Sequence, residues 1–398
     1  MKLFTRYIKK DKPYKDIVLN REDLLSHAEE IARLHAHQET NLAKRTLLPR
    51  FKQNIKFVEQ AYREIVDYST RTQDVLPATE WLLDNFYSLR DLREEIQHNL
   101  STKFERQLPR NASGDFQGYP RIYGLLVELI EHTDSQLQSD TLKAFINAYQ
   151  VQVPLSSREL WAIPMMLKII LMENIRRLTE QILFTQAERE AADLWVLPLL
   201  EAEYGPEEWV GILKRLTAPE EYSSAYAEQM LKRLRDLGVD SAPLLHWVDR
   251  VVAKQDTTIE ELAKLERQRQ SMSQVSMGHA MSSIHFVTAE DWPHLFEEVS
   301  LVEREFNKDP GRVYSEMDFK SRDVYRHQVE KIALRFKVSE LVVARKVLER
   351  SVKAQGLGRP VASHVGYDLI GPSRVELEWE LEQDYRASRN LASTVSYT

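Results

Sequence analysis

Apolar residues recur along this chain at intervals of three and four, the spacing that places them on one face of an α-helix. The spacing is clear in residues 24–34, 55–66 and 78–99. Farther on, Ser156 and Glu159 have the spacing of a capping box, which predicts the start of another helix. The pattern therefore predicts an all-α fold built from many helices.

The helical pattern is interrupted at residues 271–283, whose small, polar and methionine side chains show no useful period. We expect a linker or mobile loop there, at the end of an N-terminal helical domain of residues 1–270. A smaller C-terminal helical module is expected at residues 284–355. In residues 356–398, glycine and proline are followed by apolar residues that alternate with glutamate over residues 375–381. This predicts a short extended tail, either an edge strand or a linker.

Composition supports a folded interior made of long helices. Hydrophobic residues make up 43% of the 398 positions and charged residues 29%, which suits real cores and a well-solvated surface. The length exceeds that of a usual single domain, so two or three packed units are expected. With 12 Gly and 15 Pro, turn formers are scarce, and this favours long helices over many short strands.

Charge and cysteine content exclude several classes of function. The net charge of −7 offers no concentrated basic stripe, so nucleic acid is not an expected partner. The absence of cysteine excludes disulfides and thiolate metal sites, and it suits a reducing cytosol.

The most apolar run, residues 160–172, is shorter than the ~20 residues that a membrane-spanning helix needs. We expect it to be a buried core helix.

The N-terminal segment of residues 2–15 mixes basic and apolar side chains. Such a segment could bind an anionic membrane surface. The alternative, which we favour, is a flexible solvated terminus. The basic residues are Lys2, Arg6, Lys9, Lys10, Lys12 and Lys15, and the apolar ones are Leu3, Phe4, Tyr7 and Ile8.

Motifs for common enzyme chemistry are absent. The sequence has no GxxxxGK[ST] phosphate loop and no GxGxxG, GxSxG or HExxH motif. His35 and His37 diverge on a helix, so no metal site is predicted from them. Glu128 and His132 are an i, i+4 pair on a predicted helix. They form either a pH-sensitive or acid/base pair or, as we favour, a local hydrogen bond.

Two groups of aromatic and charged residues are the best candidates for a site, and no catalytic residue is predicted. Rings beside carboxylates and arginines could line a carbohydrate groove, but the same residues also build buried ionic networks between helices. We favour the network, because arginine binds carboxylates in a fixed fork. The first group, a candidate for glucan binding or an interface, is Tyr119, Arg121, Tyr123, Glu128, His132, Asp134, Glu159, Trp161, Glu173, Arg176 and Arg177. The second, for which we favour contact between domains, is Asp318, Arg322, Asp323, Tyr325 and Arg326.

A series of sequence blocks resembles the bacterial cyclic β-1,2-glucan synthases, in the region ahead of their membrane-embedded glycosyltransferase. The resemblance covers roughly residues 80–370. The blocks, in order, are WLLDNFY from Trp81, YPRIY from Tyr119, HTDSQL from His132, ELWAIP from Glu159, ENIRRL from Glu173, DWPHLFEEVSLVE from Asp291, DPGRVYSEMDFKSRDVYRHQVEKIA from Asp309 and HVGYDLI from His364.

The resemblance implies a parent enzyme that polymerises glucose from UDP-glucose. The Asp-x-Asp and Gln-x-x-Arg-Trp motifs expected of its transferase are missing here, so UDP-glucose and Mg²⁺ are implied only for that transferase and no cofactor is expected for this chain. We expect a non-catalytic cytosolic helical domain at the inner face of the inner membrane, where it braces or regulates the transferase. Its expected partners are the other domains of the synthase, with β-1,2-glucan as a further candidate. The extended tail would lead toward a membrane segment.

Two alternatives stay open at this point. The first is a helical (α/α)-type glycoside hydrolase or phosphorylase, for which Glu80 and Asp84, near Trp81 and Tyr87, are the nearest approach to an acid pair. Carboxylates at i and i+4 on one helix lie too close together to flank a glycosidic bond, which weighs against it. The second alternative is a stand-alone glucan-binding scaffold.

Overall fold

The computed structural model describes residues 12–36, 44–72, 75–200, 223–236, 246, 248–250 and 252–395. Helices make up the regular structure of these residues, and the one extended pairing among them is an antiparallel bridge between Arg110 and Pro120. The all-α fold class is therefore confirmed. None of the described helices is long and apolar enough to cross a membrane.

The described residues form the following helices, given in chain order. The α-helices are α1 (Arg21–Ala36), α2 (Leu48–Thr72), α3 (Pro77–Asn99), α4 (Thr102–Gln107), α5 (Arg121–His132), α6 (Ser139–Gln150), α7 (Ser157–Leu200), α9 (Ser224–Asp236), α11 (Ile259–Ala289), α12 (Trp292–Val299), α13 (Leu301–Phe306), α14 (Phe319–Phe336), α15 (Glu340–Gly356), α16 (Val365–Leu369) and α17 (Arg374–Val395). Short 3-10 helices lie at η3 (Ala253–Gln255), η4 (Tyr314–Glu316) and η5 (Pro360–Ser363).

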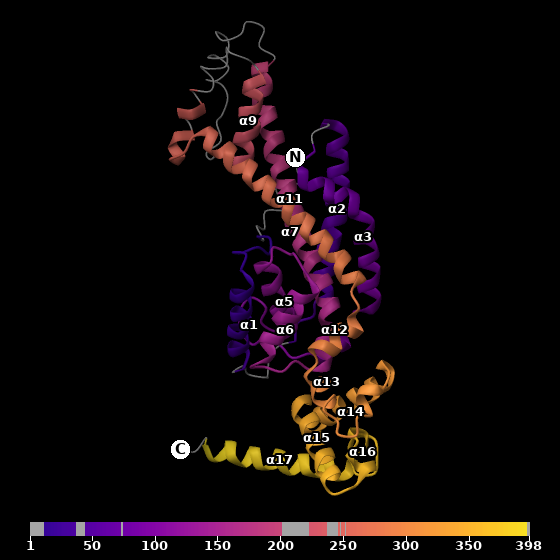
Figure 1. The fold of residues 1–398 in the computed structure, drawn as a ribbon. Helices are drawn as coiled ribbons and strands as arrows, with labels where there is room; N and C mark the ends of the chain where they lie inside the picture. The colour runs from indigo at the N-terminus through magenta and orange to yellow at the C-terminus, as the bar shows by residue number, and fades with distance from the viewer. Residues whose placement is uncertain are drawn as a thin grey trace.

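Helix α7 is the longest of these helices, and α2, α3, α5 and α11 pack along it (Figure 1). Its start is capped as the sequence predicts. The backbone N–H of Ser156 donates to Glu159 Oε2 at 3.0 Å, and that of Glu159 donates to Ser156 Oγ at 3.4 Å. The helix then continues through Pro164 without a restart.

Buried apolar side chains of the described residues form three clusters. The largest surrounds α7 and includes Leu126 and Ile170, and it extends as far as Val299 of α12. A small second cluster joins the C-terminal part of α7 to α9 and the start of α11. The third begins at Val302 and holds α13 to α17 together around Phe306. In Figure 1, α14 to α17 lie at one end of the molecule and α9 at the other.

The predicted linker at residues 271–283 is wrong, because these residues lie inside α11. A helical face is present, but most of its side chains are small. Ser276, Ala280 and Ser283 are buried at spacings of four and three, together with Met277 and Met281. A Cβ on Gly278 would lie 3.1 Å from the ring of Trp81, so the small residues allow α11 to approach α3 closely. A search for large apolar residues misses such a face.

The predicted extended tail is also wrong, since residues 374–395 form α17. Leu377 and Leu381, one helical turn apart, are buried in the third cluster, whereas Val375 and Trp379 are exposed. The alternation with glutamate therefore hid a narrow helical face. Arg374 Nε donates to Glu378 at 2.9 Å, an i, i+4 pair that helps to stabilise the helix. Residues 2–11 of the basic N-terminal segment, and His37, lie outside the described residues. The expected flexible solvated terminus is wrong for the end of this segment, because Tyr14 is buried and Lys15 pairs with Asp134.

Candidate functional site

Glu173 of α7 lies at the centre of a buried network of charged and phenolic side chains. Its carboxylate accepts from Arg50 Nε at 2.6 Å and from Arg177 Nη2 at 2.8 Å. The hydroxyls of Tyr14 and Tyr123 donate to it at 2.9 and 3.2 Å. The side chain of Glu173 is only 1% exposed, so this carboxylate is compensated entirely by protein groups.

The surrounding cations decide the ionisation of Glu173. Burial alone raises its pKa, but the hydrogen bonds and charges of Arg50 and Arg177 outweigh burial and lower the pKa to about 2. Burial also raises the pKa of Tyr14 and Tyr123, and the charge on Glu173 adds to that effect. At neutral pH both phenols therefore remain protonated donors to an ionised Glu173 carboxylate.

Arg121 of α5 and Glu159 of α7 form a second buried pair. Nε and Nη2 of Arg121 donate to the two carboxylate oxygens at 3.0 and 2.9 Å, which is the bidentate fork that arginine favours. The Arg121 guanidinium also lies over the ring of Tyr149 at 6.0 Å. The Tyr149 hydroxyl is 2.8 Å from His35 Nδ1 of α1. Burial, and next the charge of Arg121, lower the pKa of His35 to about 4.

Asp134 connects the N-terminal segment and α11 to the turn after α5. Lys15 Nζ lies 2.8 Å from one carboxylate oxygen of Asp134, and the hydroxyl of Ser276 donates to the other at 2.6 Å. Asp134 and Ser135 both have positive φ, 48° and 63°, a backbone form that costs energy in residues other than glycine. The hydroxyl of Ser283 donates to the carbonyl oxygen of Ser135. Side chains of α11 thus hold this strained turn in place.

Glu128 contacts a histidine that is distant in sequence. His27 Nε2 of α1 lies 3.0 Å from Glu128 Oε2, whereas His132 Nε2 is 3.8 Å from the same oxygen. The local hydrogen bond that we favoured between Glu128 and His132 is therefore replaced by one between helices. The two imidazole rings meet edge to face, with centroids 4.6 Å apart.

Arg326 of α14 is the centre of the second predicted group. Its Nη1 lies 3.0 Å from Glu303 of α13 and 3.2 Å from Glu297 of α12. Arg322 pairs with the same two carboxylates, at 3.0 Å in each case. Glu297 precedes and Glu303 follows the change from the first to the third apolar cluster. The two arginines therefore tie one cluster to the other.

Aromatic side chains cover the same boundary. Trp161 of α7 stacks on Phe296 with ring centroids 4.6 Å apart and an interplanar angle of 17°. Phe319 meets Trp161 edge to face at 5.9 Å. The Arg326 guanidinium lies over both phenylalanines, 4.5 Å from the centroid of Phe319 and 5.1 Å from that of Phe296. Trp161 thus stacks on another helix of the chain.

Most of the other predicted residues have partners three or four positions away in the sequence, and Tyr325 has a distant one. Arg176 pairs with Glu180 of the same helix at 2.7 Å. Asp318 caps α14 by accepting from the backbone N–H of Ser321 at 2.7 Å. Asp323 lies 3.4 Å from Arg326, the ring of Tyr325 lies beside that of His364, and Tyr119 packs near Tyr123. The first group is thus divided among several contacts. In the second, Arg322 and Asp323 gather around Arg326, whereas Asp318 and Tyr325 have other partners.

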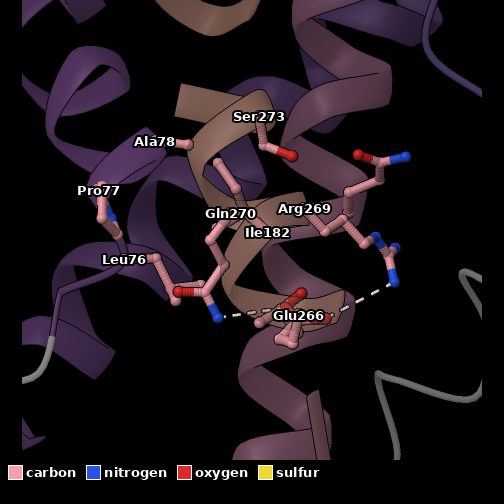
Figure 2. A pocket seen from close by; sticks show the side chains of 10 residues that line it. Leu76, Pro77, Ala78, Ile182, Glu266, Arg269, Gln270 and Ser273 are labelled. Carbon is pink, nitrogen blue, oxygen red and sulfur yellow. Dashed lines mark hydrogen bonds and ion pairs between the residues drawn. The ribbon is translucent and has the colours of Figure 1, made fainter. Parts of the chain in front are cut away.

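One pocket lies away from both predicted groups, whereas a second, a surface depression on α1, is lined by His27, the hydrogen-bond partner of Glu128 in the first group. The one in Figure 2 lies between α3, α7 and α11, with Leu76, Ile182 and Gln270 on its walls. Its polar floor is Glu266, which accepts from Gln270 at 3.2 Å and lies 3.9 Å from Arg269 (Figure 2). The cavity volume is about 20 Å³, which is enough for roughly one or two water molecules. A cavity of this volume is too small for a glucose ring.

Sequence reasoning missed the partners that complete each contact. Arg50, Tyr14 and His27 lie more than 100 positions from the residues they meet, and nothing local marks them. Glu297 and Glu303 stand inside one of the family-like blocks, yet they resemble ordinary surface glutamates. The signal available for Glu303 is its position on an apolar face, next to Val302 and Phe306.

Comparison with known proteins supports the resemblance seen in the sequence blocks. No protein-family model matches the chain. Among curated proteins, it is similar to the cyclic beta-(1,2)-glucan synthase NdvB of Rhizobium meliloti (strain 1021), with 28% identity over 336 residues. The match covers 83% of this chain and 12% of the synthase, so the chain spans about an eighth of that relative. The resemblance to cyclic β-1,2-glucan synthases is therefore confirmed over most of this all-α chain.

Proposed function

We propose that this chain is a non-catalytic helical region of a cyclic β-1,2-glucan synthase, and that it braces or regulates the adjacent UDP-glucose-dependent glucosyltransferase. It would act at the cytoplasmic face of the inner membrane, with the other domains of the synthase as partners. One observation carries the proposal: the charged residues that could have formed a sugar-binding groove have partners within the chain, and Glu159 and Glu173 are buried with theirs.

Burial supports the bracing role. Glu159 and Glu173 are each no more than 1% exposed, and each is held by arginine from another helix. A buried ion pair is a modest source of net stability, but it fixes which helices meet and in what register. A region built on such pairs suits a rigid support for a neighbouring catalytic unit.

The hydrolase alternative has less support. Glu80 and Asp84 lie on the exposed side of α3, and neither lines a detected pocket. Of the acids in the first group, Glu159 and Glu173 pair with arginine, Asp134 pairs with Lys15, and Glu128 lies against His27. An acid pair on opposite walls of a groove, which glycoside hydrolysis needs, has no counterpart among these residues.

Two measurements test the proposal. Calorimetric titration of the chain with linear and cyclic β-1,2-glucan and with UDP-glucose, with and without Mg²⁺, is expected to give no binding heat. Binding heat from a glucan would favour the glucan-binding alternative. Release of reducing sugar, assayed in the same mixture of chain and glucan, would favour the hydrolase.

The second measurement addresses bracing directly. In a complete synthase that carries this region, Arg326→Leu is expected to lower the rate of glucan synthesis from UDP-glucose while its KM stays unchanged. Arg335→Ala, which changes an arginine whose side chain is 66% exposed, is the matched control and is expected to have no effect. Full synthesis by the Arg326→Leu enzyme would contradict the bracing role.

A further inference from the structure

Three side chains with metal-binding atoms converge on the outer side of the α1–α5 contact. They are His27 of α1 and Glu128 and His132 of α5, and their ligand atoms all lie within 4.8 Å of one another. Glu128 Oε2 is 3.0 Å from His27 Nε2 and 3.8 Å from His132 Nε2. The i, i+4 spacing of Glu128 and His132 places both on one face of α5, and the packing of α1 adds the third group.

A backbone contact fixes the tautomer of His132. Its Nδ1 lies 2.9 Å from the carbonyl oxygen of Ile17, in the segment before α1. A carbonyl only accepts hydrogen bonds, so Nδ1 carries the proton. In the neutral ring, Nε2 then directs a lone pair toward Glu128. A second-shell carbonyl that orients the ring in this way is typical of histidines that bind metals.

The distances suit a small cation. With metal–ligand bonds of about 2.1 Å, the donors of a tetrahedral site lie about 3.4 Å apart, which falls between the two distances to Glu128 Oε2. Two imidazoles and one carboxylate form a donor set found at zinc sites that leave one position open. Hard cations such as Mg²⁺ prefer oxygen ligands and are disfavoured by this set.

The surroundings are acidic and open to solvent. The side chains of His27, Glu128 and His132 are 25%, 33% and 13% exposed, so an ion can enter without unfolding. His27 also lines a surface depression with Asp23, Glu29, Glu30 and Arg33, where three carboxylates face one arginine. The excess of negative charge would raise the local concentration of cations. The exposure of the site leaves room for water as a fourth ligand.

We propose that His27, Glu128 and His132 bind a late first-row divalent cation of the Zn²⁺ type, which ties α1 and the segment at Ile17 to α5. Binding displaces the proton that His27 Nε2 shares with Glu128, so affinity falls at low pH. The site does not depend on the proposed function, because it links helices within this chain.

Titration of the chelator-treated, untagged chain with ZnCl₂ tests the site. The expected result is binding of one equivalent and a rise in the melting temperature, with no response to MgCl₂. His27→Gln keeps a donor toward Glu128 and His132→Asn keeps a donor toward Ile17, yet each removes a ligand nitrogen. Each is expected to weaken binding at least about 10-fold, with circular dichroism confirming the fold.

The matched control is His294→Ala. His294 forms an i, i+4 pair with Glu298 at 3.5 Å on an exposed face of α12. It belongs to no three-ligand group among the described residues. This variant is expected to bind Zn²⁺ as the wild type does. Absence of Zn²⁺ binding by the wild type, or equal binding by His27→Gln and His132→Asn, would overturn the proposal.

Discussion

Arg326 and Glu303 form an ion pair at 3.0 Å in which each side chain is only 1% exposed. The pair lies where the first apolar cluster gives way to the third, and Glu303 also accepts from the hydroxyl of Tyr314 at 2.7 Å. Charged groups removed from water at such a boundary must be matched closely, because each would otherwise lose its hydration without compensation.

Replacing Arg326 by Leu should therefore destabilise the chain strongly. The substitution leaves Glu297 and Glu303 with fewer cationic partners, and loss of one member of a buried pair typically costs about 3–5 kcal/mol of the free energy of unfolding. Urea denaturation followed by circular dichroism measures the change. Arg335→Ala, at an exposed pair, should cost less than about 1 kcal/mol. Equal losses in the two variants would contradict the special role of Arg326.

Glu173 should stabilise the fold at neutral pH and lose that effect in acid. Its folded-state pKa of about 2 lies below the ordinary 4.5, so the contribution is present above pH 4.5 and is lost as the pH falls toward 2. Glu173→Gln should lower the free energy of unfolding by about 3 kcal/mol at pH 7. The difference from the wild type should narrow steadily below pH 4.5. A difference that does not change with pH would show that charge is not the cause.

His35 should destabilise the fold when it is protonated. Its pKa of about 4 lies below the ordinary 6.5, because burial and the nearby Arg121 disfavour the charged ring. The unfolded chain binds the proton more readily, so stability falls as the pH drops from 6.5 toward 4. Nuclear magnetic resonance titration should place the His35 pKa below that of His27, whose pKa is raised by its hydrogen bond to Glu128. The reverse order would refute this assignment.

Gly278 should be sensitive to added volume because α11 lies close to α3 there. A Cβ would come within 3.1 Å of the Trp81 ring, so Gly278→Ala is expected to cost about 1–3 kcal/mol through overpacking. Gly356 at the end of α15 has no atom within 4 Å of the same Cβ position. Gly356→Ala should be neutral or slightly stabilising. Thermal melting compares the two, and a neutral Gly278→Ala would argue against close packing of these helices.

Much of the helical architecture was predictable from local pattern. The capping pair Ser156 and Glu159 starts α7 as expected, and Glu173 and Arg177, which are four residues apart on this helix, pair at 2.8 Å. Two predictions failed where the helical face is unusual. The buried face of residues 271–283 is made of small side chains and two methionines, and that of α17, among its described side chains, is limited to Leu377 and Leu381.

The sequence by itself determined the all-α class, the main helices and which polar residues would need partners. It did so because helical periodicity, caps and i, i+4 pairs act within a few residues of each other. Only the tertiary structure decided which residues become the partners of these polar side chains. Arg50 reaches Glu173, and His27 reaches Glu128, because helix packing brings together segments separated by 123 and 101 positions. The energy of such contacts depends on burial and geometry, and neither is written in the local sequence.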